Sequence, residues 1–230
     1  MTNTYAVKRG TFLAAVIAVI LTAAVPGAAF AQSAAKTAKP AAAVKQDSPS
    51  QLVFENTKRV LSTLEIRRAE FTKNRAALQQ FINTELSSVF DRDYAARQVL
   101  GRHGRGASDA DVKLFADALA DNLMRRYGSS LLDFNTQLRV RMKTETALPR
   151  GLGVKVSSEL QRSGGDSIPV DYLMRRSGGA WKIFDVIVEG VSYVQTFRQQ
   201  FDGPLQTKSI TQVATELRAG NLKPNPSAGK

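Results

Sequence analysis

A change in hydrophobic periodicity, a little past the middle of the chain, restricts the fold more than any other feature. Before residue 128 apolar residues recur every three or four positions, which indicates amphipathic helices; after residue 132 they alternate with polar residues, which indicates half-buried strands. The stretch WKIFDVIVEG at 181–190 breaks the alternation because it is apolar on both faces. The two faces carry, respectively, Phe184, Val186 and Val188, and Trp181, Ile183 and Ile187. Such a strand must be covered on two sides.

The periodic segments predict helices in both the first and the last part of the chain. The first four are expected at 50–65, at 75–90, at 91–100 and from the N-cap Ser108 through Tyr127. Two more are expected at 192–201, ending at Asp202-Gly203-Pro204, and at 209–219, where Ser209 and Gln212 have capping-box spacing.

Strands are expected at 133–143, 152–162, 168–176 and 181–190, separated by turn-forming sequences such as SGGD and SGG. Short connections of this kind favour an antiparallel meander. The predicted fold class is therefore α+β, with N-terminal and C-terminal helices packed on a curved four-stranded antiparallel sheet. An arrangement of this type, an NTF2-like cone, encloses an apolar pocket when the helices and the sheet do not meet fully.

Residues 1–31 have the pattern of a secretory signal peptide. Lys8 and Arg9 precede a 14-residue apolar run at 12–25, and Ala29-Phe30-Ala31 has the small residues that signal peptidases recognise. Because a membrane-spanning helix needs about 20 residues, cleavage after Ala31 is favoured over a membrane anchor. A flexible Ala/Lys-rich leader at 32–48, a single domain at 49–219 and a disordered tail at 220–230 are expected to follow.

Cleavage would remove 31 of the 230 residues and leave 199, enough for one monomeric domain with a core. Loss of Lys8 and Arg9 would lower the net charge from +12 to +10. The chain has no cysteine, so it can form no disulfide and carry no lipid at a cleavage-site cysteine. We expect a soluble periplasmic protein, for which a lipid or a membrane-bound partner suits the positive charge better than nucleic acid does.

Few residues suggest enzymatic chemistry. His103 is the only histidine, and its Gly/Arg-rich loop predicts a surface residue. No nucleophile-elbow, Walker, zincin or dinucleotide motif is present, and no metal site is expected. Asp185 is the exception, because it interrupts the apolar strand. Its carboxyl either faces a basic residue such as Arg139 or Arg141, or occupies a dry pocket, where a raised pKa would suit a general base.

Two segments resemble the MlaC/toluene-tolerance family of periplasmic phospholipid-binding proteins. WKIFDVIVEGVSYVQTFRQQF at 181–201, with the helix near 208–217, resembles the C-terminal signature of the family. LSSVFDRDYAARQVLGRHGRGAS at 86–108 and RRYGSSL at 125–131 are also similar to it, and the resemblance spans roughly 50–219. It implies a deep apolar pocket that takes acyl chains and leaves the headgroup outside. It also implies a soluble carrier, moving lipid between an outer-membrane lipoprotein complex and an inner-membrane ABC transporter with an MCE-domain subunit.

The alternation of the strands and the helical stripes give candidate residues for this pocket. We expect no cofactor; bound phospholipid would be the cargo. The sheet side is predicted to comprise Phe134, Leu138, Val140, Val156, Val170, Tyr172, Phe184, Val186 and Val188. The helix side is predicted to comprise Leu119, Leu123, Tyr127, Val194 and Phe197. Candidates for contact with a headgroup or a partner are Arg125, Arg126, Arg175, Arg176, Gly190 and Val191.

Three functions are compatible with these features. The first is a non-enzymatic phospholipid carrier that helps to maintain the lipid asymmetry of the outer membrane. The second is a small-molecule enzyme of the NTF2-like type that uses Asp185. The third is an envelope adaptor that docks through its basic surface and binds no lipid.

Overall fold

A computed structural model of the chain describes residues 48–132, 138–162 and 166–228. The predicted signal peptide, almost all of the predicted leader and the candidate pocket residue Phe134 lie outside these ranges. Within the described residues the fold is α+β, as expected, with seven α-helices and an antiparallel sheet.

Except for the end of α7 (Tyr193–Thr207), the expected helices begin and end close to the predicted positions. Ser108 caps its helix as expected, accepting a hydrogen bond from the backbone N–H of Asp111 at 3.1 Å, and Ser209 and Gln212 form the predicted capping box. A short helix at 68–73 was not foreseen. The helices are α2 (Pro49–Ile66), α3 (Arg68–Lys73), α4 (Arg75–Ser87), α5 (Arg92–Leu100), α6 (Asp109–Tyr127), α7 (Tyr193–Thr207) and α8 (Ile210–Ala219).

The sheet has five strands in sequence order, each antiparallel to the next. The prediction of four strands missed β5, because its two residues are too few to show a periodic pattern. The strands are β1 (Leu138–Ala147), β2 (Val154–Arg162), β3 (Ile168–Ser177), β4 (Ala180–Val188) and β5 (Val191–Ser192).

One face of the sheet, here called the inner face, is buried. It is defined by alternate residues on β2, β3 and β4, which lie opposite one another across the strands. Helix α2 packs against this face over β1 and β2. The inner face comprises Val156, Ser158, Leu160, Ile168, Val170, Tyr172, Met174, Ile183, Val186 and Val188, all of which are buried.

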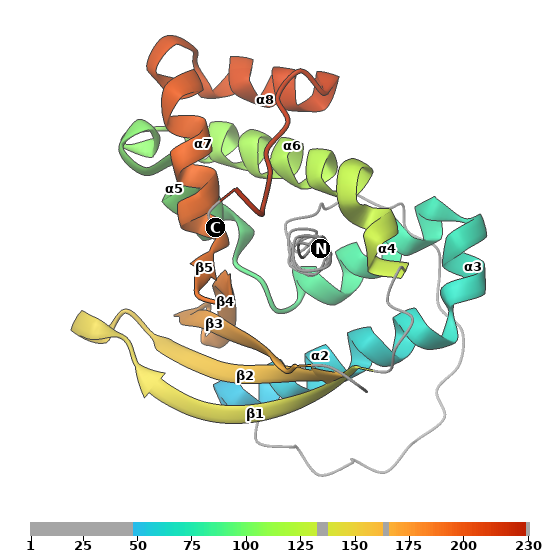
Figure 1. The fold of residues 1–230 in the computed structure, drawn as a ribbon. Coiled ribbons are helices and arrows are strands. Elements are labelled where there is room, and N and C mark those ends of the chain that lie inside the picture. Colours follow the sequence, from blue (N-terminus) through green and yellow to red (C-terminus); the bar gives the residue numbers. More distant parts are fainter. Residues whose placement is uncertain (1–47, 133–137, 163–165, 229–230) are drawn as a thin grey trace, which may run out of the picture.

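Strand β4 is covered on both faces, as its sequence requires. On the outer face it contacts α5 and α7. Its free edge is also occupied: Ile183 donates its N–H to Val89 and accepts from the N–H of Asp91, at 2.8 and 2.7 Å. In Figure 1, α6, α7 and α8 lie together above the sheet, while α2 runs beside β1 and β2 on the other side of the molecule.

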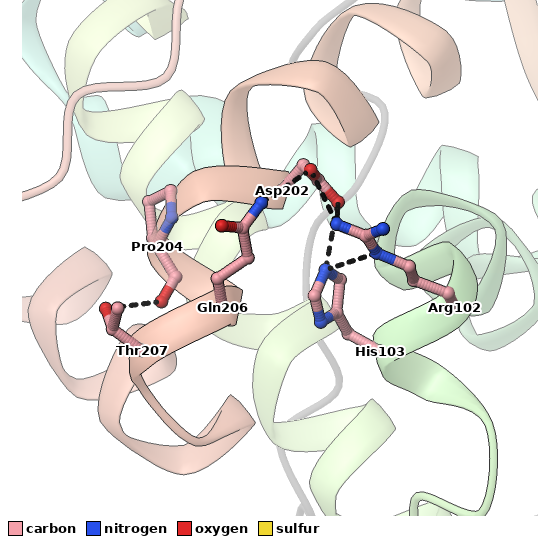
Figure 2. Close-up of polar contacts among 6 residues, drawn as sticks. All are labelled: Arg102, His103, Asp202, Pro204, Gln206 and Thr207. Carbon is pink, nitrogen blue, oxygen red and sulfur yellow. Dashed lines mark hydrogen bonds and ion pairs between the residues drawn. The ribbon is translucent and has the colours of Figure 1, made fainter.

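Helix α7 continues past the predicted stop at Asp202-Gly203-Pro204. Proline disfavours a helical residue before it because its ring collides with that residue's Cβ, and Gly203 has no Cβ. The helix therefore runs on to Thr207, whose hydroxyl donates to the carbonyl of Pro204 at 3.4 Å (Figure 2).

The C-terminal tail was predicted to be disordered, and the structure contradicts this for residues 220–228. Asn122 of α6 donates its side-chain N–H to the carbonyls of Leu217 and Leu222, at 2.6 and 3.1 Å. The side-chain amide of Gln200 both donates to and accepts from the backbone of Asn225, at 2.8 Å each. The tail was misjudged because these contacts come from helices far away in the sequence.

We expect Asn122→Ala to lower the free energy of unfolding by about 1–3 kcal/mol. Asn122 is 1% exposed. Its loss removes the side-chain donor to the carbonyl of Leu222 in the tail and one of the two side-chain donors to the carbonyl of Leu217, the other being Arg125. Urea titrations followed by circular dichroism measure the change. Asn221→Ala, which removes an exposed amide nearby, is the matched control, and equal effects of the two variants would contradict the assigned role.

Candidate functional site

The inner face is a continuous array of buried apolar side chains arranged in cross-strand rows. Val156, Tyr172 and Val186 lie in one row across β2, β3 and β4, and Val170 and Val188 lie opposite each other in the next. Each of these five side chains is at most 6% exposed. The predicted sheet side of the pocket therefore does assemble on one face for these residues.

The hydroxyl groups of Ser158 and Tyr172 on the inner face are paired. Ser158 donates its hydroxyl to the carbonyl of Val170 at 3.1 Å. Burial raises the pKa of the Tyr172 hydroxyl, against the opposing effect of hydrogen bonds with Thr57 and Ser158. Both groups thus stay neutral at physiological pH, and this part of the face has the character of a hydrocarbon surface.

Phe184 does not share the face of Val186, contrary to the prediction. The β3–β4 register places Asp185 opposite Leu173 and Ile183 opposite Met174, so Phe184 is the extra residue of a β-bulge. Its ring meets Tyr94 of α5 edge-on, with centroids 5.2 Å apart. Ile183 takes the inner-face position instead, and a strict two-residue alternation could not reveal the shift.

The remaining candidate pocket residues lie in different environments. Leu138 and Val140 on β1 are half-buried, and Val140 lies opposite Leu160 of the inner face. Leu119 and Leu123 are fully buried in α6, whose main helical neighbours are α5 and α8.

The other candidates come from the end of α6 and from α7. Val194 and Phe197 are buried in α7. Tyr127 is half-buried, and its hydroxyl donates to the carbonyl of Pro224 in the tail at 3.3 Å.

Two of the four candidate arginines hold the fold together. Arg125 donates to the carbonyls of Leu217 and Arg218 at the end of α8, at 3.1 Å each. Arg175 donates to Asp91 at 2.5 Å and lies over the ring of Tyr94. These contacts explain both arginines without a ligand.

The other proposed contact residues are nearer the surface. Arg126 lies over the ring of Tyr127, 5.5 Å from its centroid. Arg176 donates to the carbonyl of Gly179 at 2.9 Å and stacks over Trp181. Gly190 belongs to the turn between β4 and β5 and has a φ of 84°, while Val191 pairs with Val188 in β5.

Asp185 faces neither Arg139 nor Arg141, contrary to the simpler expectation. It is 4% exposed and accepts hydrogen bonds from the hydroxyl of Ser192, at 2.6 Å, and the N–H of Val194, at 3.1 Å. The carboxylate thus lies at the N-terminus of α7, where negative charge is favoured. Burial raises its pKa to about 6, although these hydrogen bonds oppose the shift.

The two oxygens of Asp185 are thus occupied by the start of α7. Ser192 is the N-cap and uses the same hydroxyl oxygen to accept from the N–H of Gln195 at 3.0 Å. The buried carboxyl of Asp185 thus has a structural role, since it joins the start of α7 to β4.

The pKa of Asp185 has a consequence for stability. Because the ordinary pKa of an aspartate is 3.8 and that of Asp185 in the fold is about 6, the unfolded chain loses this proton first as the pH rises. Stability from this group is therefore greatest below pH 4 and falls between about pH 4 and 6, by about 3 kcal/mol. We expect Asp185→Asn to be stabilised relative to the wild type as the pH rises through this window.

The measurement is the difference in unfolding free energy between wild type and Asp185→Asn at several pH values from 4 to 8. Asp166→Asn, which removes an exposed carboxylate, is the control. A wild-type minus variant difference that stays constant across this range would contradict the assignment.

His103 was expected to be a surface residue; it is half-buried and has a partner in α7. Its Nε2 lies 2.9 Å from Asp202 of α7, and Arg102 donates to the same carboxylate at 3.0 Å (Figure 2). The hydrogen bond with His103 is the main cause that lowers the pKa of Asp202. The loop after α5 is thereby fastened to the middle of α7, and this contact was missed because 99 residues separate the two partners.

A solvent-open cleft of about 310 Å³ lies where α4, α5, α6 and the β3–β4 turn meet. Its charges include Asp91, which is paired with Arg175, and Lys113, which is paired with Asp117 at 3.2 Å. This cleft is polar and so unsuited to acyl chains. It is lined by Ser87, Phe90, Asp91, Arg92, Asp93, Lys113, Ser177 and Lys182.

No group of three or more His, Cys, Asp or Glu side chains is placed to hold a metal ion within the described ranges. In the same ranges no helix combines the length and the apolar character needed to cross a membrane.

The helices on a curved sheet and the apolar inner face are those of an α+β binding fold, and the comparisons identify its family. The chain belongs to the MlaC family: the family's sequence profile, described as MlaC protein, matches residues 55–219. The fold matches that of a phospholipid-binding protein from Ralstonia solanacearum, solved in complex with a phospholipid, with a TM-score of 0.66 at 20% identity. The match covers 75% of this chain and 96% of the Ralstonia chain.

Two relatives have similar sequences over most of their length. The toluene tolerance protein ttg2D of Pseudomonas putida is 28% identical over 170 residues, which are 73% of this chain and 77% of the relative. The intermembrane phospholipid transport system binding protein MlaC of Haemophilus influenzae is 19% identical over 185 residues, 79% of this chain and 86% of the relative. The resemblance expected from the sequence is therefore confirmed.

Proposed function

We propose that this protein is a periplasmic carrier that holds the acyl chains of a phospholipid against the inner face of its sheet. The observation that carries the proposal is the continuous set of buried apolar side chains on one face of the sheet, made by Val156, Val170, Tyr172, Val186 and Val188, beside which the hydroxyl of Ser158 is paired. Membership of the MlaC family supports it, as does the phospholipid bound by the Ralstonia protein of the same fold.

The need for a carrier follows from the free energy of exposing lipid tails to water. A two-tailed phospholipid has on the order of 30 methylene groups, and each contributes about 0.8 kcal/mol to the cost of leaving the bilayer, roughly 24 kcal/mol in total. A protein lowers this barrier when it offers the tails a surface about as dry as the membrane. Tighter binding would hinder delivery.

The length of the sheet is suited to such cargo. Strand β4 has nine residues, which at about 3.3 Å each span roughly 30 Å. An extended acyl chain could therefore lie along one strand.

The proposal includes where the carrier works. We propose that residues 1–31 direct export, that cleavage follows Ala31, and that the monomeric protein moves lipid between the two membranes and so helps to maintain lipid asymmetry. The proposed partners are an outer-membrane lipoprotein complex and an inner-membrane ABC transporter with an MCE-domain subunit. The positive net charge of the chain suits contact with acidic protein surfaces or anionic lipid.

A buried charge on the inner face tests the lipid-binding role. We expect Val140→Glu to reduce co-purified lipid by about tenfold or more, because an unpaired carboxylate beside the acyl chains must be desolvated. Val140 is half-buried, so the change is less disruptive than one at fully buried Val186. Native mass spectrometry of the purified protein measures the bound lipid.

Arg139→Glu is the matched control, since it places the same residue on the exposed outer face of the same strand. Circular dichroism confirms that both variants fold. Lipid occupancy of Val140→Glu equal to that of the wild type would contradict the proposed site, and a wild type that neither carries lipid nor takes it up from vesicles would contradict the proposed function.

A further inference from the structure

One arginine on the inner face has no partner among the residues that the structure describes. Arg162 is the last residue of β2 and lies two residues beyond Leu160, on the same face as Val156 and Ser158. Its cross-strand partner on β1 is the apolar Leu138. Sequence alternation contains this signal, since Arg162 ends the series of alternate residues that are otherwise buried, but it was not singled out.

The guanidinium of Arg162 is partly desolvated without compensation. Its Nε is buried and makes no hydrogen bond, and no ion pair to Arg162 is found within the described ranges. Asp166, in the connection between β2 and β3, is exposed and forms no ion pair with it there. Burying a guanidinium donor unpaired costs free energy, which an anion placed at this point would recover.

An arginine lies near each of two ends of the inner face, Arg176 at one and Arg162 at the other. Of the two, only Arg162 lacks a hydrogen-bonding partner among the described residues. Arg176 continues the series Tyr172, Met174 on β3, but it is held by the carbonyl of Gly179 and the ring of Trp181. Arg162 lies at the opposite end, where β2 leads into β3.

The turn after β4 reaches this same end of the sheet. Val170 pairs with Val188, and the N–H of Glu189 donates to the carbonyl of Pro169 at 3.0 Å. An acyl chain lying along the strands would therefore finish beside Arg162 on one side and the Gly190 turn on the other.

We propose that Arg162 binds the phosphate of the cargo phospholipid and so selects phosphate-bearing lipids over neutral lipids with the same tails. This inference rests on the proposed carrier function. The planar fork of a guanidinium matches two phosphate oxygens, which favours arginine over lysine at such a position. The tails supply most of the affinity through burial, and Arg162 supplies the choice of headgroup.

The test uses delipidated protein and vesicles that contain equal amounts of phosphatidylglycerol and diacylglycerol with identical acyl chains. Native mass spectrometry measures the lipid bound by wild type, Arg162→Gln, Arg162→Lys and Arg139→Gln. We expect the wild type to be enriched in phosphatidylglycerol by about tenfold or more, the discrimination that one charge-assisted hydrogen bond provides.

Arg162→Gln should lose this enrichment while its total lipid content changes by less than about twofold. Arg162→Lys should keep part of it through its charge, and Arg139→Gln, on the outer face, should behave as the wild type does. Unchanged enrichment in Arg162→Gln would overturn the assignment while leaving the carrier function intact. Failure of the wild type to take up either lipid would overturn both.

Inorganic phosphate distinguishes a headgroup site from a site for the free anion. Repeated in an excess of inorganic phosphate, the wild-type enrichment should persist, because the acyl chains hold the headgroup phosphate beside Arg162. Loss of the enrichment would assign Arg162 to free phosphate and overturn the headgroup assignment.

Discussion

The rest of the structure depends on the burial of β4 on both faces. A strand with no solvated face can exist only between layers. Helix α5 and the start of α7 contact β4, and its inner-face residues Ile183, Val186 and Val188 are at most 5% exposed. Asp185 joins these layers, because its carboxylate satisfies backbone and hydroxyl donors that the start of α7 would otherwise bury unpaired. A polar residue in an apolar strand thus fixes where the C-terminal helices begin.

This arrangement separates the ion pairs and helix caps of the molecule from its apolar inner face. The ion pairs and caps, including Asp91 with Arg175 and Asp202 with His103, lie on the outer face or between helices. The inner face is left with few polar atoms, and those of Ser158 and Tyr172 are internally paired. The proposed carrier role requires this division, because side chains that hold lipid tails must be shielded from water while the polar contacts elsewhere keep the fold specific.

The features of the fold that the sequence predicted correctly are those that depend on residues close together in the chain. Neighbouring residues determine the helix starts at Ser108 and Ser209, the positions of β2 and β3, and the buried series from Ile168 to Met174. These features were therefore predictable from the sequence. The bulge at Phe184 was not, since it depends on the register with β3, and the ordered tail was not, since Asn122 and Gln200 hold it from other helices.

The candidate site was predictable only in part for the same reason. The alternation of apolar residues correctly placed Val156, Val170 and Val186 on one face of the sheet. The hydrogen-bonding partners of polar side chains could not be predicted in this way, because they lie on other elements of the fold. Arg125 and Arg175, which the sequence offered as contacts for a ligand, prove to be held by the fold. Arg162 was not among the residues proposed from the sequence, and its buried Nε has no acceptor among the described residues.

Strand β1 has a further consequence for the behaviour of the protein at high concentration. It is the outermost strand of the sheet in the described ranges, and its register with β2 shifts between Met142 and Glu145. A bent backbone bearing the exposed side chains of Arg139, Arg141 and Lys143, the last two paired with Glu159 of β2, offers a second molecule an irregular row of hydrogen-bonding groups beside charged side chains. The strand is thus protected against fibril-like stacking from one copy to the next, so crowding alone should not turn this sheet into a seed for aggregates.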